Sequence, residues 1–306
     1  MDIQTAGEYE SCFFLTFVMD ICACMKKLIV FLLCFAGYLL VSSYDSNPAD
    51  LIDRMIEKNK TIKTLSVDVT IKERIKDKTI NKFNHFTLQV DPYKVYFTES
   101  KFGIDLEGLF VAGAYNNQAR IATVGFPWIK LDLDPMGSKM RNETHHTIYE
   151  AGFGYFINVV SHFKSKYGDK FSDMMTYQGL FMKGQVYFYK IVLDNPNFKY
   201  SEYTVKKGEN LNTIAKKIWV NDYMILEKNP ALADFNDVKE GQKIIVPSDY
   251  AKKMVFHLDK TLMLPLYVEL YDDKGFYASY SFSNIQINPQ LDKSVFDYTN
   301  PKYHFN

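Results

Sequence analysis

The sequence lacks cysteine beyond position 34. All four cysteines of the 306-residue chain lie early, at Cys12, Cys22, Cys24 and Cys34. Their absence from the rest of the chain excludes a disulfide framework there. It excludes a thiol nucleophile and a cysteine-ligated metal site from the same region.

The sequence also lacks an excess of charge of either sign. Its 36 Lys and Arg residues balance 36 Asp and Glu residues, and no long basic block occurs. Nucleic acid is therefore not expected as a partner. The chain has no low-complexity tract and no internal repeat. It has no nucleophile elbow and no phosphate-binding glycine loop either, so no common enzyme motif is present.

The first part of the chain carries a secretory signal-peptide pattern. The positive pair Lys26-Lys27 precedes an apolar run at 28–40, and Val41-Ser42-Ser43 supplies small residues for a signal peptidase. This pattern predicts translation from Met25 and cleavage near Ser43, so that residues 1–43 are a leader. The predicted location is therefore the periplasm or cell envelope.

Two alternatives remain open for this leader. In the first alternative the apolar run is not cleaved and stays as an anchor, although it is short for a membrane-spanning helix. In the second alternative a lipid is attached at Cys34, although residues 31–33, Phe-Leu-Leu, lack the small residue expected before a lipidated cysteine. Any membrane association is accordingly expected to be transient.

Aromatic residues, in contrast to cysteine, are abundant: they make up 16% of the whole chain, and they favour strands. Asn47-Pro48 is a typical helix start, and apolar residues at helical spacing predict a helix over about 48–62. From Leu65 the apolar period changes to two, which predicts an antiparallel meander. A second helix is predicted over about 152–166, followed by further strands. The fold class predicted is α+β.

Residues 203–247 form a separate unit in this pattern, between a linker at Pro196 and another at Pro247. The unit reads as strand, helix, helix, strand, and its helices are predicted from apolar residues at helical spacing. It resembles the LysM domain, a peptidoglycan- and chitin-binding module. The matching residues are Tyr203-Thr204-Val205, Lys207-Gly208-Glu209, Leu211, Ile214-Ala215, Asn229-Pro230, Gly241-Gln242 and Ile245-Val246-Pro247.

The resemblance to LysM domains implies binding of a glycan that contains N-acetylglucosamine, in a shallow groove between two loops. Carried onto this chain, the groove residues are Gly208, Glu209, Asn210 and Leu211 on one side and Asn229, Pro230, Ala231 and Leu232 on the other. Glu209 and Asn210 depart from the Asp and Thr or Ser usual in the family. A purely structural or protein-contacting role of the unit is the alternative.

The rest of the chain resembles the LolA/LolB lipoprotein-carrier fold at residues 255–297 and 48–71. Residues 130–160 look closer to an uncharacterised exported family, domain of unknown function family fifteen-seventy-one. These resemblances imply a curved, unclosed antiparallel sheet packed on helices, made of residues 44–199 and 250–306, with residues 200–249 inserted. The concave side would take up acyl chains of a lipid or lipoprotein. Candidate lining residues are Phe86, Leu88, Val95, Phe97, Leu109, Val111, Phe188 and Val268, which as an alternative simply fill the core.

Catalysis is not expected, and no catalytic residue, metal ligand or cofactor is assigned. The segment at 141–146 places Glu143 near His145 and His146, and Asp132 and Asp134 share a strand face. A cell-wall glycan hydrolase that uses Asp132, Asp134, Glu143 or His145 is therefore one alternative function. An envelope scaffold that binds only other proteins is another.

Overall fold

The structure is a computed structural model that describes residues 47–76, 78–101 and 103–305. The chain falls into two units, Met1–Asn47 and Pro48–Asn306, and all described helices and strands belong to the second. The predicted leader and its cleavage near Ser43 lie outside the described residues. No helix in the described part is long and apolar enough to cross a membrane.

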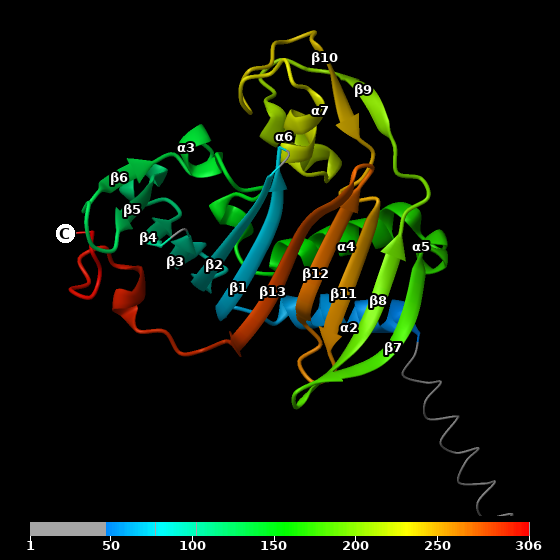
Figure 1. The fold of residues 1–306 in the computed structure, drawn as a ribbon, viewed down its shortest axis with the longest axis horizontal. Coiled ribbons are helices and arrows are strands. Elements are labelled where there is room, and N and C mark those ends of the chain that lie inside the picture. Colours follow the sequence, from blue (N-terminus) through cyan, green and yellow to red (C-terminus); the bar gives the residue numbers. More distant parts are fainter. Residues whose placement is uncertain (1–46, 77, 102, 306) are drawn as a thin grey trace, which may run out of the picture. The chain divides into compact units, whose positions relative to one another are not determined.

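An open antiparallel sheet is the main feature of the second unit (Figure 1). The strand order is β6-β5-β4-β3-β2-β1-β13-β12-β11-β8-β7, with eleven strands in one sheet. The strands are β1 (Thr64–Ile75), β2 (Lys78–Gln89), β3 (Lys94–Lys101), β4 (Ile104–Val111), β5 (Ala119–Thr123), β6 (Lys130–Leu133), β7 (Met175–Lys183), β8 (Val186–Asp194), β11 (Lys253–Asp259), β12 (Pro265–Asp272) and β13 (Gly275–Ile287). The two end strands β6 and β7 do not pair with each other, so the sheet is unclosed. The predicted fold class is confirmed.

Two longer helices accompany this sheet, α2 (Pro48–Lys60) and α4 (Gly154–Tyr167). The buried side of α2 consists of Leu51, Ile52 and Met55, which recur at helical spacing. Both helices lie within two residues of their predicted starts, because a periodic apolar stripe is a strong local signal. Figure 1 shows both helices crossing behind the strands. Short α3 (Ser138–Arg141) and α5 (Lys170–Asp173) were not predicted.

The strand alternation divides side chains between two apolar clusters. Phe110 joins the large core with the helices, whereas its neighbour Leu109 joins a small cluster with Ala122 and Phe305. Successive residues of a strand point to opposite faces, so adjacent positions serve different clusters. The chain's last residues therefore cover part of the second face of the sheet.

Residues between β8 and β11 form a strand–helix–helix–strand unit, as predicted. Its elements are β9 (Tyr200–Thr204), α6 (Leu211–Ile218), α7 (Asp222–Lys228) and β10 (Lys243–Pro247). β8 pairs directly with β11, with Asp194 opposite Lys253. The unit thus leaves the sheet and re-enters it at adjacent positions, and Figure 1 shows it near the end of β1. Its limits at 200 and 249 remain a prediction.

Candidate functional site

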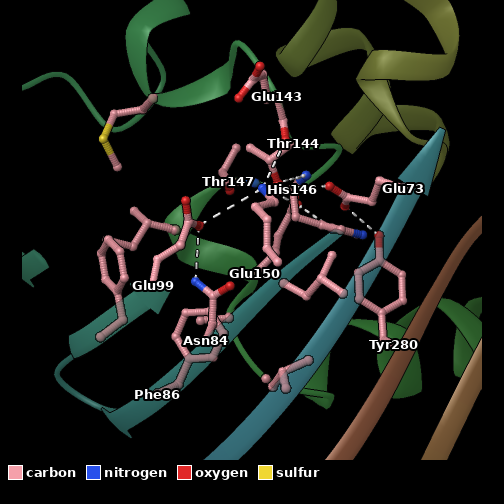
Figure 2. A pocket seen from close by; sticks show the side chains of 18 of the residues that line it. Glu73, Asn84, Phe86, Glu99, Glu143, Thr144, His146, Thr147, Glu150 and Tyr280 are labelled. Atoms are coloured by element: carbon pink, nitrogen blue, oxygen red, sulfur yellow. Dashed lines mark hydrogen bonds and ion pairs between the residues drawn. The ribbon is translucent and has the colours of Figure 1, made fainter. Parts of the chain in front are cut away.

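A cavity of about 410 Å³ lies between the sheet and residues 139–152 (Figure 2). Its lining comes from β1 to β4, β13, α4 and that segment. The lining residues are Val69, Ile71, Glu73, Lys82, Asn84, Phe86, Phe97, Glu99, Ile104, Leu106, Lys139, Met140, Asn142, Glu143, Thr144, His146, Thr147, Ile148, Glu150, Ala151, Gly152, Phe156, Tyr280 and Phe282. Cavities of about 300–1,000 Å³ are the usual size for small-molecule sites.

The strand period explains why the cavity has both apolar and charged walls. On β1 the residues Val69, Ile71 and Glu73 are two apart, so they share one face of the sheet. On β2 the corresponding face carries Lys82 and Asn84 and then Phe86. Both strands therefore change from apolar to polar residues along the same face of the sheet.

Aromatic rings form much of the apolar wall. Phe86 and Phe97 are cross-strand partners with ring centroids 6.0 Å apart. The Phe97 ring lies over Gly108 of β4, where an added Cβ would sit only 2.2 Å from a ring carbon. Glycine at that position therefore leaves room for the Phe97 ring, and Phe97 in turn shapes the cavity.

The charged wall centres on Glu73, which is fully buried. Tyr280 Oη donates a hydrogen bond of 2.7 Å to Glu73 Oε1. Lys82 Nζ lies 3.8 Å from Glu73 Oε2 and 4.0 Å from Glu99 Oε2. Burial alone would raise the pKa of Glu73, but the neighbouring His145, Lys82 and Tyr280 outweigh it, so its pKa lies below the ordinary value. The Glu73 side chain is therefore a buried carboxylate.

His146 and Glu150 hold the opposite wall in place. His146 Nδ1 is 2.9 Å from Glu150 Oε2, and that oxygen also accepts from the Thr147 backbone N–H at 3.1 Å. The other ring nitrogen of His146 lies 3.2 Å from Tyr250 Oη. These contacts tie the segment that closes the cavity to Tyr250 and so give it a defined conformation.

The eight predicted cavity residues lie in several places. Phe86 and Phe97 line the cavity, while Leu88, Val95 and Val268 are buried in the main core. Leu109 and Val111 belong to the small cluster on the second face. Phe188 stacks on Phe181 and His257, at centroid distances of 5.8 and 4.6 Å. The strand pattern identified apolar faces but not which part of them borders a cavity.

Glu73, Lys82 and Asn84 of the cavity were not predicted from the sequence, although a signal for them exists. In the β1 sequence, positions 65, 67, 69 and 71 are Leu, Val, Val and Ile, and position 73 continues that face with Glu. A charged residue at a core-facing position is unusual. Lys82 and Asn84 break the apolar face of β2 in the same way.

In the predicted glycan groove, three polar side chains form hydrogen bonds within the inserted unit itself. Glu209 accepts from Tyr203 Oη, the Lys206 backbone N–H and Lys217 Nζ, each at 2.9 Å. The Asn210 side chain caps α6 at the Thr213 N–H. The Asn229 side chain bridges to the Ile225 carbonyl and to both backbone groups of Ile245.

The remaining groove candidates divide by exposure. Gly208, Pro230 and Ala231 are exposed, whereas Leu211 and Leu232 are buried. Gly208 has φ of +77°, a left-handed conformation that favours glycine. The Leu211 backbone N–H donates to the Phe235 carbonyl at 2.9 Å and so ties the loop before α6 to the loop after α7. Any sugar contact here would come from backbone groups and small side chains.

The candidate hydrolase residues each have a partner. Asp132 accepts two hydrogen bonds from Arg120, at 2.8 and 3.0 Å, and Asp134 accepts from the Met136 N–H at 2.9 Å. His145 is fully buried and stacked on Tyr277, and its Nε2 lies 2.8 Å from the Arg74 carbonyl. Among the described residues, no group of three or more His, Cys, Asp and Glu side chains is arranged to hold a metal ion. Glu143 is the member of this set that lines the cavity.

The inserted unit contacts the segment that closes the cavity through a buried ion pair. Arg141 is 1% exposed, and its two terminal nitrogens donate to the Asp222 carboxylate at 3.0 and 2.6 Å. The Arg141 guanidinium also lies 4.2 Å from the centre of the Phe235 ring. On either side of Arg141 in the sequence, Met140 and Asn142 line the cavity. One short segment therefore borders both the cavity and the inserted unit.

No family model matches this chain, and no curated protein matches it. Among solved structures, MucB aligns with a TM-score of 0.40 and 10% identity over 80% of this chain and 60% of MucB. LprF from Mycobacterium bovis aligns with a TM-score of 0.37 and 10% identity, over 79% of this chain and 93% of LprF. Lipoprotein LppX of Mycobacterium tuberculosis aligns with a TM-score of 0.36 and 11% identity, over 81% of this chain and 100% of LppX. This chain thus spans about three fifths of MucB, and likenesses this distant carry no argument about a ligand.

Proposed function

We propose that this chain is an exported envelope protein that binds an amphiphile in the cavity under its open sheet. One observation carries the proposal: the cavity of about 410 Å³ has an apolar wall that continues into a charged wall. An apolar chain would lie against Phe86, Phe97 and Leu106. Each methylene buried there contributes about 0.8 kcal/mol, and a lipid or a lipoprotein acyl chain is the class of ligand this wall fits.

Filling the cavity should abolish this binding. Leu106 is half-buried and lines the cavity, so in Leu106→Trp the larger ring would project into the space where the ligand would lie. We expect the neutral fluorescent probe N-phenyl-1-naphthylamine to bind residues 44–306 and to bind the variant at least about tenfold more weakly, a loss of about 1.4 kcal/mol. Fluorescence titration measures both affinities.

The matched control is Leu131→Trp, because Leu131 is an exposed β6 residue outside the cavity. This variant should bind the probe as the unchanged chain does. Circular dichroism checks that both variants are folded. Equal probe affinity of the Leu106→Trp and Leu131→Trp variants would show that the cavity is not the binding site.

We further propose that the inserted unit attaches the protein to peptidoglycan or a related N-acetylglucosamine glycan. The strand–helix–helix–strand order and the exposed Gly208, Pro230 and Ala231 support this, together with the resemblance of residues 203–247 to LysM domains. Since the polar side chains of the two loops are already hydrogen-bonded, recognition would use backbone groups and the small Ala231 side chain.

Retention on insoluble peptidoglycan tests the attachment. The chain should sediment with the polymer, and Ala231→Glu should abolish sedimentation, because a buried carboxylate without a partner opposes the contact. Ala233→Glu is the control, since Ala233 is equally exposed but lies outside the proposed groove. No retention of the unchanged chain would favour a scaffold that contacts proteins only.

A further inference from the structure

We infer that the cavity selects an amphiphile whose polar head is a hydrogen-bond donor with a positive charge, a primary ammonium group, and rejects anionic heads. This inference rests on the proposed amphiphile binding and specifies its ligand. It is carried by two independent features of the charged wall: its balance of charges, and buried acceptor atoms there that have no donor. Figure 2 shows the side chains that form this wall.

The charges of the cavity lining are predominantly acidic. Four glutamates, Glu73, Glu99, Glu143 and Glu150, line it together with two lysines, Lys82 and Lys139. Lys82 lies within ion-pair distance of both Glu73 and Glu99, so one cation serves two carboxylates. An anionic head group would add a further negative charge to this wall, whereas a cationic one would offset the excess.

Lys82 does not donate a hydrogen bond to the Glu73 carboxylate that it approaches. Its Nζ donates to the Glu143 backbone carbonyl at 2.8 Å but remains 3.8 Å from Glu73 Oε2, too far for a hydrogen bond. Glu73 Oε2 accordingly has no hydrogen-bond partner, while Glu73 Oε1 accepts from Tyr280. A buried carboxylate oxygen without a donor is costly.

A second acceptor without a donor lies on the next strand. Asn84 is 3% exposed, and its amide nitrogen donates to Glu99 Oε2 at 3.2 Å. This contact fixes the amide orientation, because exchanging nitrogen and oxygen would place two acceptors against each other. Asn84 Oδ1 then has no partner. A third atom without a partner, Thr147 Oγ1, is a hydroxyl oxygen that can also accept. All three atoms belong to residues that line the cavity and are themselves buried, so a head group bearing N–H donors would pair with them as these side chains turn towards it.

A primary ammonium fits both features, since it combines one positive charge with three N–H donors. An alcohol supplies one donor and no charge, whereas a carboxylate supplies no donor and carries a negative charge. The affinities of three dodecyl compounds should therefore follow the order ammonium, alcohol, carboxylate. The apolar chain, common to all three, would lie along the aromatic wall and contribute equally.

Competition with N-phenyl-1-naphthylamine at pH 7 and 0.15 M salt tests this order on residues 44–306. We expect dodecylammonium to displace the probe at concentrations at least about tenfold lower than dodecanoate. In Glu73→Gln this preference should fall to within about twofold, because the substitution removes the charge and retains the shape. Glu57→Gln is the matched control, since Glu57 is an exposed helix residue paired with Lys60, and it should keep the full preference.

Glu99→Gln is a second variant for testing the preference for dodecylammonium over dodecanoate. The Glu99 side chain is 19% exposed, so its substitution disturbs the core less than that of Glu73, and it should also reduce the preference. If dodecanol displaces the probe but dodecylammonium is no better than dodecanoate, the head-group inference is overturned and amphiphile binding stands. If none of the three compounds displaces the probe, amphiphile binding itself fails.

Discussion

Asp222→Ala is expected to lower the free energy of unfolding by about 3–5 kcal/mol. The substitution would leave the Arg141 guanidinium buried without its carboxylate, at a position where only 1% of the residue is exposed. The remaining contacts of Arg141 are a 3.4 Å hydrogen bond to the His145 carbonyl and the ring of Phe235, and neither offsets a full charge. Urea unfolding followed by circular dichroism measures the loss.

Two further variants identify the cause of this loss. Glu202→Ala removes an exposed ion pair with Lys243 and should cost only about 0–1 kcal/mol. The double variant Arg141→Met with Asp222→Leu removes both charges and should recover most of the loss, because the penalty comes from an unpaired charge. A loss below 1 kcal/mol for Asp222→Ala would mean that water reaches Arg141 and that the contact of residues 141–145 with Asn221 and Asp222 opens readily.

The contact of residues 141–145 with Asn221 and Asp222, called the junction below, holds the inserted unit against the cavity wall. The Asn221 side chain adds to the ion pair, with a 3.1 Å hydrogen bond from its Nδ2 to the His145 carbonyl and a 2.9 Å hydrogen bond accepted from Tyr277. Arg74 at the end of β1 pairs with Glu227 of α7 at 3.0 Å. A protein held to the cell wall through this unit would therefore present its cavity in a fixed orientation to the polymer.

The elements that the sequence predicts are those with a local signal. The stripe of Leu51, Ile52 and Met55 predicts α2, and the alternation of β1 predicts a strand with one buried face. The pairing of β1 with β13 could not be predicted in this way. Leu65 lies opposite Ile287 in that pair, and the contact depends on the packing of segments more than two hundred residues apart.

The candidate site was less predictable than the fold for the same reason. Phe86 and Phe97 could be placed on an apolar face, but the cavity also needs the segment at 139–152 to cover that face. The partners of Glu73 come from β2 and β13, through Lys82 and Tyr280. Such a cluster is visible only after the strands have been placed next to one another. The same holds for Arg141, whose partner Asp222 lies on α7 of the inserted unit, 81 positions further along the chain.

The same junction should make stability depend on pH through His145. Burial lowers the pKa of His145 from 6.5 to about 4 in the folded chain, so the folded state resists the proton that the unfolded state accepts. The contribution to stability is therefore complete above pH 6.5 and is lost as the pH falls from 6.5 towards 4. A difference of about 2.5 pKa units corresponds to about 3 kcal/mol. Glu73 acts in the same direction but at lower pH, because its pKa lies below an ordinary value of 4.5.

His145→Phe isolates this contribution, because a phenyl ring can keep the stacking between Tyr223 and Tyr277 but cannot be protonated. At pH 7 the variant should be less stable by about 1 kcal/mol, since the hydrogen bond to the Arg74 carbonyl is lost. Towards pH 4 that difference should shrink and then reverse in sign, as the unchanged chain loses the contribution of its neutral imidazole. His257, whose pKa burial also lowers to about 4, is present in both proteins and cancels in the comparison. Parallel loss of stability in the two proteins from pH 6.5 to 4, in urea titrations at each pH, would show that His145 accepts a proton without disturbing the junction.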